Sequence, residues 1–389
     1  MTRTPSQGPP ATGLRRLPAA PRGLLVIGFL YIFLVGVSML EAGINNLGAG
    51  FQQGLLESVD NPLAGLFTGI LATVLVQSSS VTTATIVGLV GSGTLPIDAA
   101  APMIMGANIG TTITNTLVAL GHTRRNEEFR RAFAAATMHD FFNITTVLIF
   151  FPLELTTKFL TRAAEKLADV VAATGLAGGD TKSPLKQIVK EPVSWAESLL
   201  GKVTDSEQIL GVLLLIFGLA LIFSALLLIS RNMRALIATR IELAMNSVIA
   251  RGGGFVGAVV GTLVTIAVQS SSITTSIVVP LVGSGVLTIR NAYPLTLGAN
   301  VGTPVTALLA SLAVDQRAGL VIALHHALFN IFGVTLHFLL YPVPGEPRYI
   351  PVRLAERLAD AATRRRSLVA VYVVGVFLIV PLAGIVILR

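Results

Sequence analysis

A run of uncharged hydrogen-bonding side chains occurs twice in this sequence. Residues 77–83 read Gln-Ser-Ser-Ser-Val-Thr-Thr, and residues 269–275 read Gln-Ser-Ser-Ser-Ile-Thr-Thr. Serine and threonine hydroxyls can donate hydrogen bonds to an oxyanion, and the oxygens of Gln, Ser, Thr and the backbone suit a small hard cation. In apolar surroundings such a cluster is costly unless its groups meet a ligand, water or other protein groups. The pattern therefore predicts a binding site for small ions.

The segments around these runs contain no charged side chain, from Pro62 to Leu95 and from Gly252 to Ile289. We therefore expect no fixed positive charge beside a bound anion, so that the cations which offset its charge must bind with it. The same segments contain no His or Cys, and a nucleophilic serine needs a base or a metal beside it. This composition argues against an enzyme.

The two runs belong to an internal repeat. By direct count, about 24 of the 44 positions from Gln77 to Leu120 are identical to the equivalent positions from Gln269 to Leu312. The match includes the stretch 106–111, Gly-Ala-Asn-Ile-Gly-Thr, which recurs as Gly-Ala-Asn-Val-Gly-Thr at 298–303. Because the copies are in register, we expect both runs to serve one purpose.

The composition places these repeats in a membrane. The chain of 389 residues is 53% hydrophobic and only 12% charged, and its mean hydropathy is +0.77. A soluble core of this length could not bury so much apolar surface, so we expect an integral membrane protein. The net charge of +8 comes from basic residues in short segments between apolar runs, which indicates positive-inside topology rather than nucleic-acid binding.

Each Gln-Ser-Ser-Ser run divides an apolar stretch into halves of roughly 14 to 19 residues, shorter than the ~20 that a span needs. We expect a helix-break-helix hairpin that enters the membrane and returns to its starting side, because unwound backbone at depth must be buried in protein. The following segments, 96–120 and 292–314, are predicted to be transmembrane helices broken at Gly106–Gly110 and at the equivalent glycines.

The predicted fold is an all-α integral membrane protein with two inverted-topology repeats, each with a Gln-Ser-Ser-Ser hairpin and a broken transmembrane helix. Arginine-rich segments predict a cytoplasmic N-terminus and hairpins that enter from opposite faces, so their tips meet near the midplane. One occluded site there favours a transporter over a channel, which needs a continuous polar pore. The expected parts are a disordered cytoplasmic tail (1–21), a first transmembrane repeat (22–152), an extracytoplasmic linker with an amphipathic helix (153–207), a second transmembrane repeat (208–342), and a cytoplasmic amphipathic segment with a final transmembrane helix (343–389).

Ionisable residues also occur within the predicted spans. His139 and Asp140 lie near the middle of the span after the first repeat, where such a pair is either functional or a hydrogen-bonded structural pair. His325, His326 and Asn330 lie in the matching place after the second repeat. We interpret this second group as structural.

Together these motifs resemble the type II sodium-dependent phosphate cotransporter family, which includes animal members, from about Pro62 to Pro344. Besides the paired Gln-Ser-Ser-Ser runs, the resemblance is carried by residues 102–110, 114–116, 128–133, 139–143 and 292–298. It implies coupled uptake of inorganic phosphate with sodium ions, in a phosphate cradle made of Gln77, Ser78, Ser79, Ser80, Gln269, Ser270, Ser271 and Ser272. It also implies sodium ligands among nearby oxygens, for which we expect Gln77, Thr83, Asn108, Thr111, Asn115, Gln269, Thr275, Asn300 and Thr303. One departure is Pro304, which stands where the first repeat has Thr112.

The leading hypothesis is a sodium-coupled symporter that imports inorganic phosphate by alternating access across the cell inner (plasma) membrane. The alternative is a sodium- or proton-coupled symporter of another oxyanion, such as sulfate or a carboxylate. The expected partners are inorganic phosphate, sodium ions and the lipid bilayer, with no nucleic acid and with a homodimer as an open option. We expect no cofactor other than sodium as the coupling ion, and no enzymatic activity.

Overall fold

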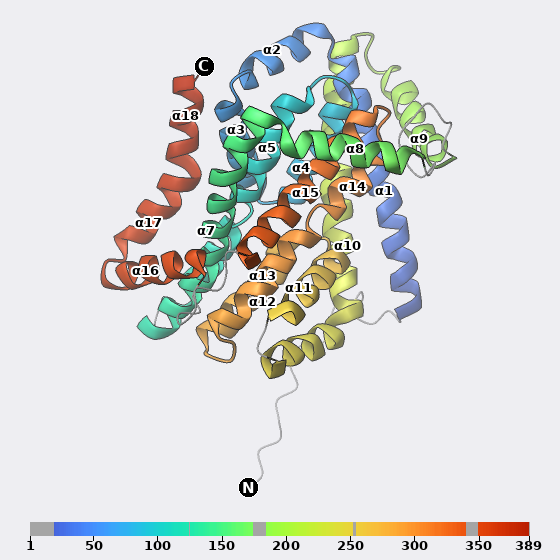
Figure 1. Cartoon of the computed structure of the whole chain (residues 1–389). Helices are drawn as coiled ribbons and strands as arrows, with labels where there is room; N and C mark the ends of the chain where they lie inside the picture. The colour runs from blue at the N-terminus through green and yellow to red at the C-terminus, as the bar shows by residue number, and fades with distance from the viewer. Residues whose placement is uncertain (1–18, 124, 174–183, 252–253, 340–348, 389) are drawn as a thin grey trace.

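The computed structural model describes residues 19–123, 125–173, 184–251, 254–339 and 349–388, and these residues form helices and turns without a strand (Figure 1). Within them, six helical segments are long and apolar enough to cross a membrane. The predicted all-α membrane fold is thereby confirmed. Residues 1–18 of the predicted tail and residues 178–183 of the Gly-rich part of the predicted linker lie outside the described residues.

The helices form two series with the same order, except that α2 of the first series has no separate counterpart in the second. The first series is α1 (Ala19–Asn46), α2 (Ala49–Val59), α3 (Pro62–Val76), α4 (Ser79–Gly91), α5 (Ile97–Gly110), α6 (Ile113–Leu120) and α7 (Asn126–Thr157). After α8 (Phe159–Ala173) and α9 (Pro184–Leu200), the second series is α10 (Glu207–Arg251), α11 (Gly254–Val268), α12 (Ser271–Gly283), α13 (Ile289–Gly302), α14 (Val305–Ser311) and α15 (Arg317–Leu339). The chain ends with α16 (Ile350–Arg364), α17 (Ser367–Val374), a π-helical turn (Gly375–Ile379) and α18 (Val380–Leu388).

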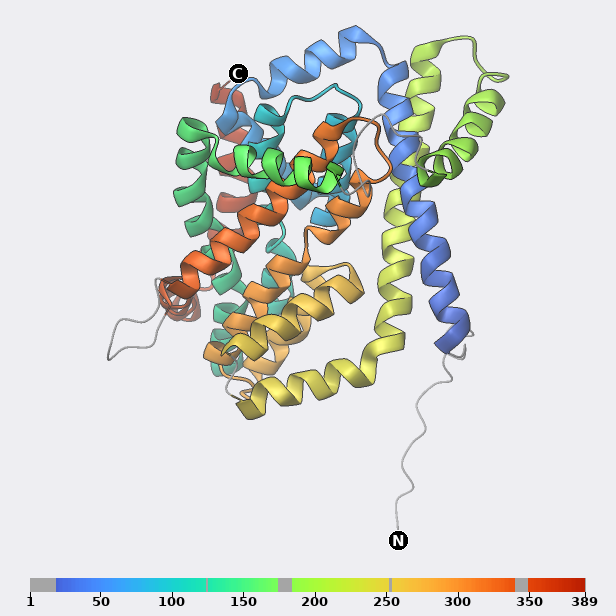
Figure 2. The same ribbon diagram turned by 45° about the vertical axis from the view of Figure 1, so that its right-hand side comes forward.

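The two series run in opposite directions through the molecule. In Figure 1, α1 and α7 run upward, whereas α10 and α15 run downward. The pair α3 and α4 lies in the upper half, and the pair α11 and α12 lies in the lower half (Figures 1 and 2). The two helix pairs therefore lie in opposite halves of the molecule.

A long antiparallel pair, α1 and α10, forms one side of the molecule (Figure 2). Its contact is made through facing glycines, because a Cβ on Gly43 would come within 2.6 Å of the Leu215 nitrogen and one on Gly218 within 2.7 Å of the Leu40 nitrogen. Small residues allow membrane helices to approach closely, so this pair makes a continuous wall beside the remaining helices.

The break predicted at Gly106–Gly110 is wrong in position. Helix α5 stays helical through Gly110, and the chain leaves the helix at Thr111 and Thr112. The glycines instead allow α5 to lie directly on α3, because a Cβ on Gly106 would overlap the carbonyl oxygen of Leu66. These glycines allow the backbones of α3 and α5 to pack closely, and the helix is interrupted only after the last of them.

The second series repeats this arrangement. Helix α13 continues through Gly302, and its break comes at Thr303 and Pro304. A Cβ on Gly298 would overlap the backbone of Ala258 in α11. In both series the second helix of the broken span begins directly after the two residues of the break, at Ile113 and at Val305.

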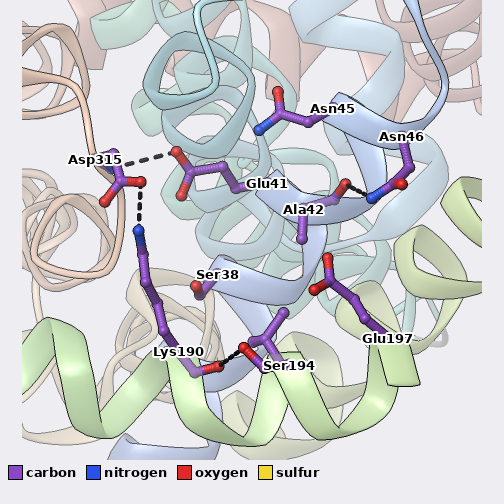
Figure 3. A pocket seen from close by; sticks show the side chains of 10 residues that line it. Ser38, Glu41, Ala42, Asn45, Asn46, Lys190, Ser194, Glu197 and Asp315 are labelled. Atoms are coloured by element: carbon purple, nitrogen blue, oxygen red, sulfur yellow. Dashed lines mark hydrogen bonds and ion pairs between the residues drawn. The ribbon is translucent and has the colours of Figure 1, made fainter. Parts of the chain in front are cut away.

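Polar contacts tie together the upper end of the molecule. Lys190 of α9 forms an ion pair with Asp315, which follows α14, at 2.6 Å, and the backbone N–H of Asp315 donates to the buried Glu41 of α1 at 3.3 Å. These residues border a cavity of about 230 Å³ that Ser38 and Glu197 also line (Figure 3). Helix α9 is thus joined to both series.

The last helices cover α7. The guanidinium of Arg366 lies 3.8 Å from the ring centre of Phe129, and Arg130 is paired with Asp360 of α16 at 3.4 Å. Farther along, the hydroxyl of Tyr372 in α17 donates to Asp140 of α7 at 2.8 Å. The final span is therefore attached to the first series.

Candidate binding site at the two Gln-Ser-Ser-Ser breaks

The two Gln-Ser-Ser-Ser runs have the same local structure. Gln77 and Gln269 end α3 and α11 in the left-handed region, with φ of 57° and 56°. A non-glycine residue is strained there, and such strain is found at functional sites. Ser78 and Ser270 are extended, and each hydroxyl accepts from the backbone N–H three residues later at 3.3 Å. These N-caps begin α4 and α12, whose first free N–H groups lie at the breaks.

Both glutamine side chains are held in one orientation. The amide nitrogens of Gln77 and Gln269 donate to backbone carbonyls three residues earlier, each at 2.6 Å. The side-chain oxygen of Gln77 accepts from Thr114 at 3.3 Å, and that of Gln269 accepts from Thr306 at 3.0 Å. Sequence reasoning did not assign these two threonines to the site. The sequence did contain a signal for them, because a threonine stands at the same distance, 37 residues, after each glutamine.

The two breaks contact each other across the molecule. The Ser80 hydroxyl donates to the Gln269 carbonyl at 3.3 Å and lies 3.5 Å from the Thr306 hydroxyl. From the other series, the Ser272 hydroxyl donates to the Thr111 carbonyl at 3.4 Å. Residues 189 positions apart in the sequence are thus brought to one place.

A cavity of about 330 Å³ lies at this meeting point. Six of the eight residues predicted to hold phosphate line it, namely Gln77, Ser78, Ser80, Gln269, Ser270 and Ser272. The other two, Ser79 and Ser271, are 7% and 2% exposed and are not among its lining residues. Thr114 and Ser276 add two further hydroxyl-bearing side chains to the lining.

Helix α10 forms one wall of this cavity. It contributes Phe223, Leu226, Leu227, Ser230 and Arg234. The expectation that no fixed positive charge lies beside the site is therefore wrong at one position, Arg234. The charge-free segments do surround the breaks, but the arginine comes from a helix outside both of them.

A network of buried side chains lies behind the cavity. The Thr275 hydroxyl donates to the Asn115 side-chain oxygen at 2.7 Å, and the Asn115 amide nitrogen is 3.4 Å from Nδ1 of His139. The other ring nitrogen of His139 is 2.7 Å from the side-chain oxygen of Asn300. All four side chains are at most 2% exposed.

The network continues through Asn143. Its side-chain oxygen accepts from Asn300 at 2.7 Å, and its amide nitrogen donates to the Asn108 carbonyl at 2.6 Å. Four predicted sodium ligands, Asn108, Asn115, Thr275 and Asn300, are thus brought together, whereas Asn143 was not assigned as one. The hydroxyls of Thr83, Thr111 and Thr303 donate instead to carbonyls of their own helical segments at 2.9 to 3.3 Å.

The second series does not duplicate this network. His326 and Asn330 occupy the positions equivalent to His139 and Asn143 and are at most 1% exposed, yet their side chains have no hydrogen-bond partner among the described residues. Ala307 stands at the position equivalent to Asn115. The site is therefore built unequally from the two series.

Comparisons with known proteins agree with these motifs. A family model described as Na+/Pi-cotransporter matches residues 32–177 and 214–337, which is more than half of the chain. The chain is 33% identical over 430 residues to sodium-dependent phosphate transport protein 2A of Ovis aries, which covers 92% of this chain and 66% of that protein. It is 34% identical over 448 residues to sodium-dependent phosphate transport protein 2B of Homo sapiens, and this match covers 93% of this chain and 64% of that protein. The chain thus spans just under two thirds of the length of these relatives, and no solved structure matches it.

Proposed function

Because this chain belongs to the Na+/Pi-cotransporter family, we propose that it imports inorganic phosphate together with sodium ions. The family is one of transporters, not of enzymes, and its members compared above are named sodium-dependent phosphate transport proteins. The observation that carries the proposal is the contact between the two Gln-Ser-Ser-Ser breaks at one cavity. A site made by both halves of a transporter can be opened to either side when the halves move.

Phosphate binds in the cavity through hydroxyl and backbone donors. Ser80 and Ser272 direct hydroxyls to the place where the breaks meet. Both serines lie in the first turns of α4 and α12, where backbone N–H groups have no partner within the helix and the positive ends of two helix dipoles lie beside the cavity. Helix N-termini of this kind are ordinary binding sites for phosphate oxygens.

Sodium binds to the neutral oxygens beside the phosphate. The side-chain oxygens of Gln77 and Gln269 are fixed by Thr114 and Thr306, and the network through Asn115 and Asn300 supplies further oxygens. Sodium is a small hard cation that takes such ligands. Since the breaks carry no charge, sodium also reduces the cost of placing an anion in the membrane.

Transport proceeds by alternating access between two inverted repeats. Support comes from the repeated helix order and from the opposite directions of α1 and α10 and of α7 and α15 (Figures 1 and 2). Broken helices near the midplane are typical of transporters with this symmetry. The N-terminus is cytoplasmic in this arrangement, in agreement with the distribution of arginines.

The test is uptake of radiolabelled phosphate into proteoliposomes that contain the purified protein. We expect uptake with an inward sodium gradient and none when choline replaces sodium. Arsenate, which shares the shape and charge of phosphate, should compete, and sulfate should compete poorly. Equal uptake in choline contradicts sodium coupling, and strong competition by sulfate favours a symporter for another oxyanion.

A further inference from the structure

We propose that Arg234 of α10 is a phosphate-binding residue, which supplies the fixed positive charge at the mouth of the cavity. This proposal rests on the phosphate import proposed above and adds a ligand from outside the two Gln-Ser-Ser-Ser runs. Arg234 is exposed and lines the same cavity as Ser80 and Ser272.

The position of Arg234 follows from the periodicity of α10. The lining residues Phe223, Leu226, Leu227, Ser230 and Arg234 are spaced at three, four, seven and eleven residues from the first, so they share one face of the helix. That face points at the breaks. Its upper part is apolar, and its last two members are a hydroxyl and a guanidinium.

Ser230 fixes this face against the site. Its hydroxyl donates to the Val268 carbonyl at 2.7 Å, and Val268 is the last residue of α11, directly before Gln269. Ser230 is only 6% exposed, so the bond is shielded from solvent. Arg234 lies one helical turn farther along the same face, which places it at the exposed end of the cavity wall.

The charge of Arg234 is available for an anion. Among the described residues no carboxylate forms an ion pair with it. A guanidinium keeps its charge at every physiological pH, and its fork of N–H donors matches two oxygens of a phosphate. Arg234 therefore offsets a part of the negative charge of phosphate, and the sodium ions offset another part.

Arg231 provides a matched control. It lies on the same helix three residues earlier and is also exposed, but it is not among the lining residues. Removing its charge changes the net charge of the protein and of α10 by the same amount as removing that of Arg234. Any difference between the two variants therefore reports position rather than total charge.

The experiment compares Arg234→Ala, Arg234→Lys and Arg231→Ala in proteoliposomes. We expect Arg234→Ala to raise the half-saturating phosphate concentration at least tenfold, and Arg234→Lys to raise it less because a point charge remains. The sodium concentration for half-maximal uptake at saturating phosphate should stay unchanged. Arg231→Ala should match the wild type in both measurements. Equal phosphate dependence of Arg234→Ala and Arg231→Ala overturns the proposal.

A second measurement uses the wild-type protein and does not depend on the folding of a variant. Phenylglyoxal modifies accessible arginines, and peptide mass spectrometry measures the rate at each site. With sodium present, inorganic phosphate should slow modification of Arg234 and leave that of Arg231 unchanged. Equal protection of both, or of neither, overturns the role of Arg234. If the wild type imports phosphate normally in that case, the proposed function stands and only this inference fails.

Discussion

The serine hydroxyls of the two runs differ in their surroundings, and this difference predicts their roles. Ser80 and Ser272 line the cavity and donate across to the opposite series, whereas Ser79 and Ser271 are buried outside its lining. We expect Ser80→Ala and Ser272→Ala to weaken phosphate binding by about 1.5 to 3 kcal/mol, or roughly 10- to 150-fold, because a hydrogen bond to a charged ligand is lost. Phosphate titrations at saturating sodium measure this effect.

The neighbouring serines are the controls for this prediction. Ser79→Ala and Ser271→Ala keep the backbone N–H groups at the start of α4 and α12, so we expect phosphate affinity to change less than threefold, or about 0.6 kcal/mol. If these variants lose as much phosphate affinity as Ser80→Ala and Ser272→Ala do, then lining the cavity does not determine which serine hydroxyls bind phosphate.

Asp140 is a buried carboxylate inside the membrane region, and its role is open to a direct test. It is 0% exposed, accepts from the Tyr372 hydroxyl at 2.8 Å, and forms no ion pair with a described Lys or Arg. A buried negative charge without a cation is unfavourable, so we expect it to attract sodium. Asp140→Asn should raise the sodium concentration for half-maximal uptake at least fivefold.

Tyr372→Phe separates this role from a structural one. It removes the hydrogen bond but keeps the carboxylate, so we expect a loss of roughly 1.5 to 3 kcal/mol in stability and an unchanged sodium dependence. Sodium titrations and thermal unfolding in detergent distinguish the two effects. If Asp140→Asn lowers only the unfolding temperature, the carboxylate is structural.

At this scale the sequence pattern brought out the two Gln-Ser-Ser-Ser runs, but not every residue that lines the cavity or orients the glutamines. The paired Gln-Ser-Ser-Ser runs are visible because both copies have them. Arg234 has no such signal, because it comes from α10, and only the helical face that it shares with Ser230 brings it to the cavity. Thr114 and Thr306 do recur, but only the folded chain shows that they orient the glutamines.

Close packing at glycines determines how the helices of each series fit together. A Cβ on Gly298 of α13 would overlap the backbone of Ala258 in α11, and backbone cannot move aside as a flexible side chain can. We expect Gly298→Ala to destabilise the protein by roughly 1 to 3 kcal/mol or more through overpacking. Thermal unfolding of the purified protein in detergent measures this change.

Gly257 is the matched control at the same helix pair. Its added Cβ would come no closer than 3.4 Å to the Leu295 nitrogen, which is ordinary contact. Gly257→Ala should therefore leave the unfolding temperature close to that of the wild type. Equal losses at the two positions would show that general helix propensity, and not the close approach of α11 and α13, sets the requirement for glycine.

The element boundaries show where sequence patterns mislead. Glycines in a membrane helix are read as a break, but the stretch Gly106–Gly110 is helical because its glycines face α3. The break falls at Thr111 and Thr112, whose hydroxyls donate to carbonyls of the preceding turn. The length of the segment and its apolar character predicted the span, while the exact point of interruption depends on packing against a helix from elsewhere in the chain.

At the scale of the whole molecule, composition predicted the membrane class because apolar surface of this extent has no other stable location. The six candidate spans of the described residues confirm that level of the prediction. The orientation of the two series is a separate matter, because hydropathy alone does not distinguish a parallel repeat from an inverted one. It rests on where arginines lie and on the opposite directions of α1 and α10.

Equivalent positions in the two series provide a direct test of the inverted orientation. Asp98 lies in the first turn of α5, which follows the helix pair α3 and α4. Arg290 lies at the equivalent position of α13, which follows α11 and α12, and both side chains are exposed. Inverted repeats place them on opposite faces of the membrane, with the acidic residue outside and the basic residue in the cytoplasm. A parallel repeat would place both on one face.

Single cysteines at these positions report the side on which each lies, and the native chain contains no cysteine that would give background. We expect Asp98→Cys to react with a membrane-impermeant maleimide in intact cells and Arg290→Cys to react only after permeabilisation. Thr123→Cys, in the exposed turn before α7, should behave as Arg290→Cys does, because α5 and α6 together cross the membrane from the face of Asp98. Labelling of Asp98→Cys and Arg290→Cys from the same side would contradict the inverted arrangement. The two breaks could then not enter from opposite faces, and alternating access between inverted halves would have to be abandoned even if phosphate uptake were sodium-dependent.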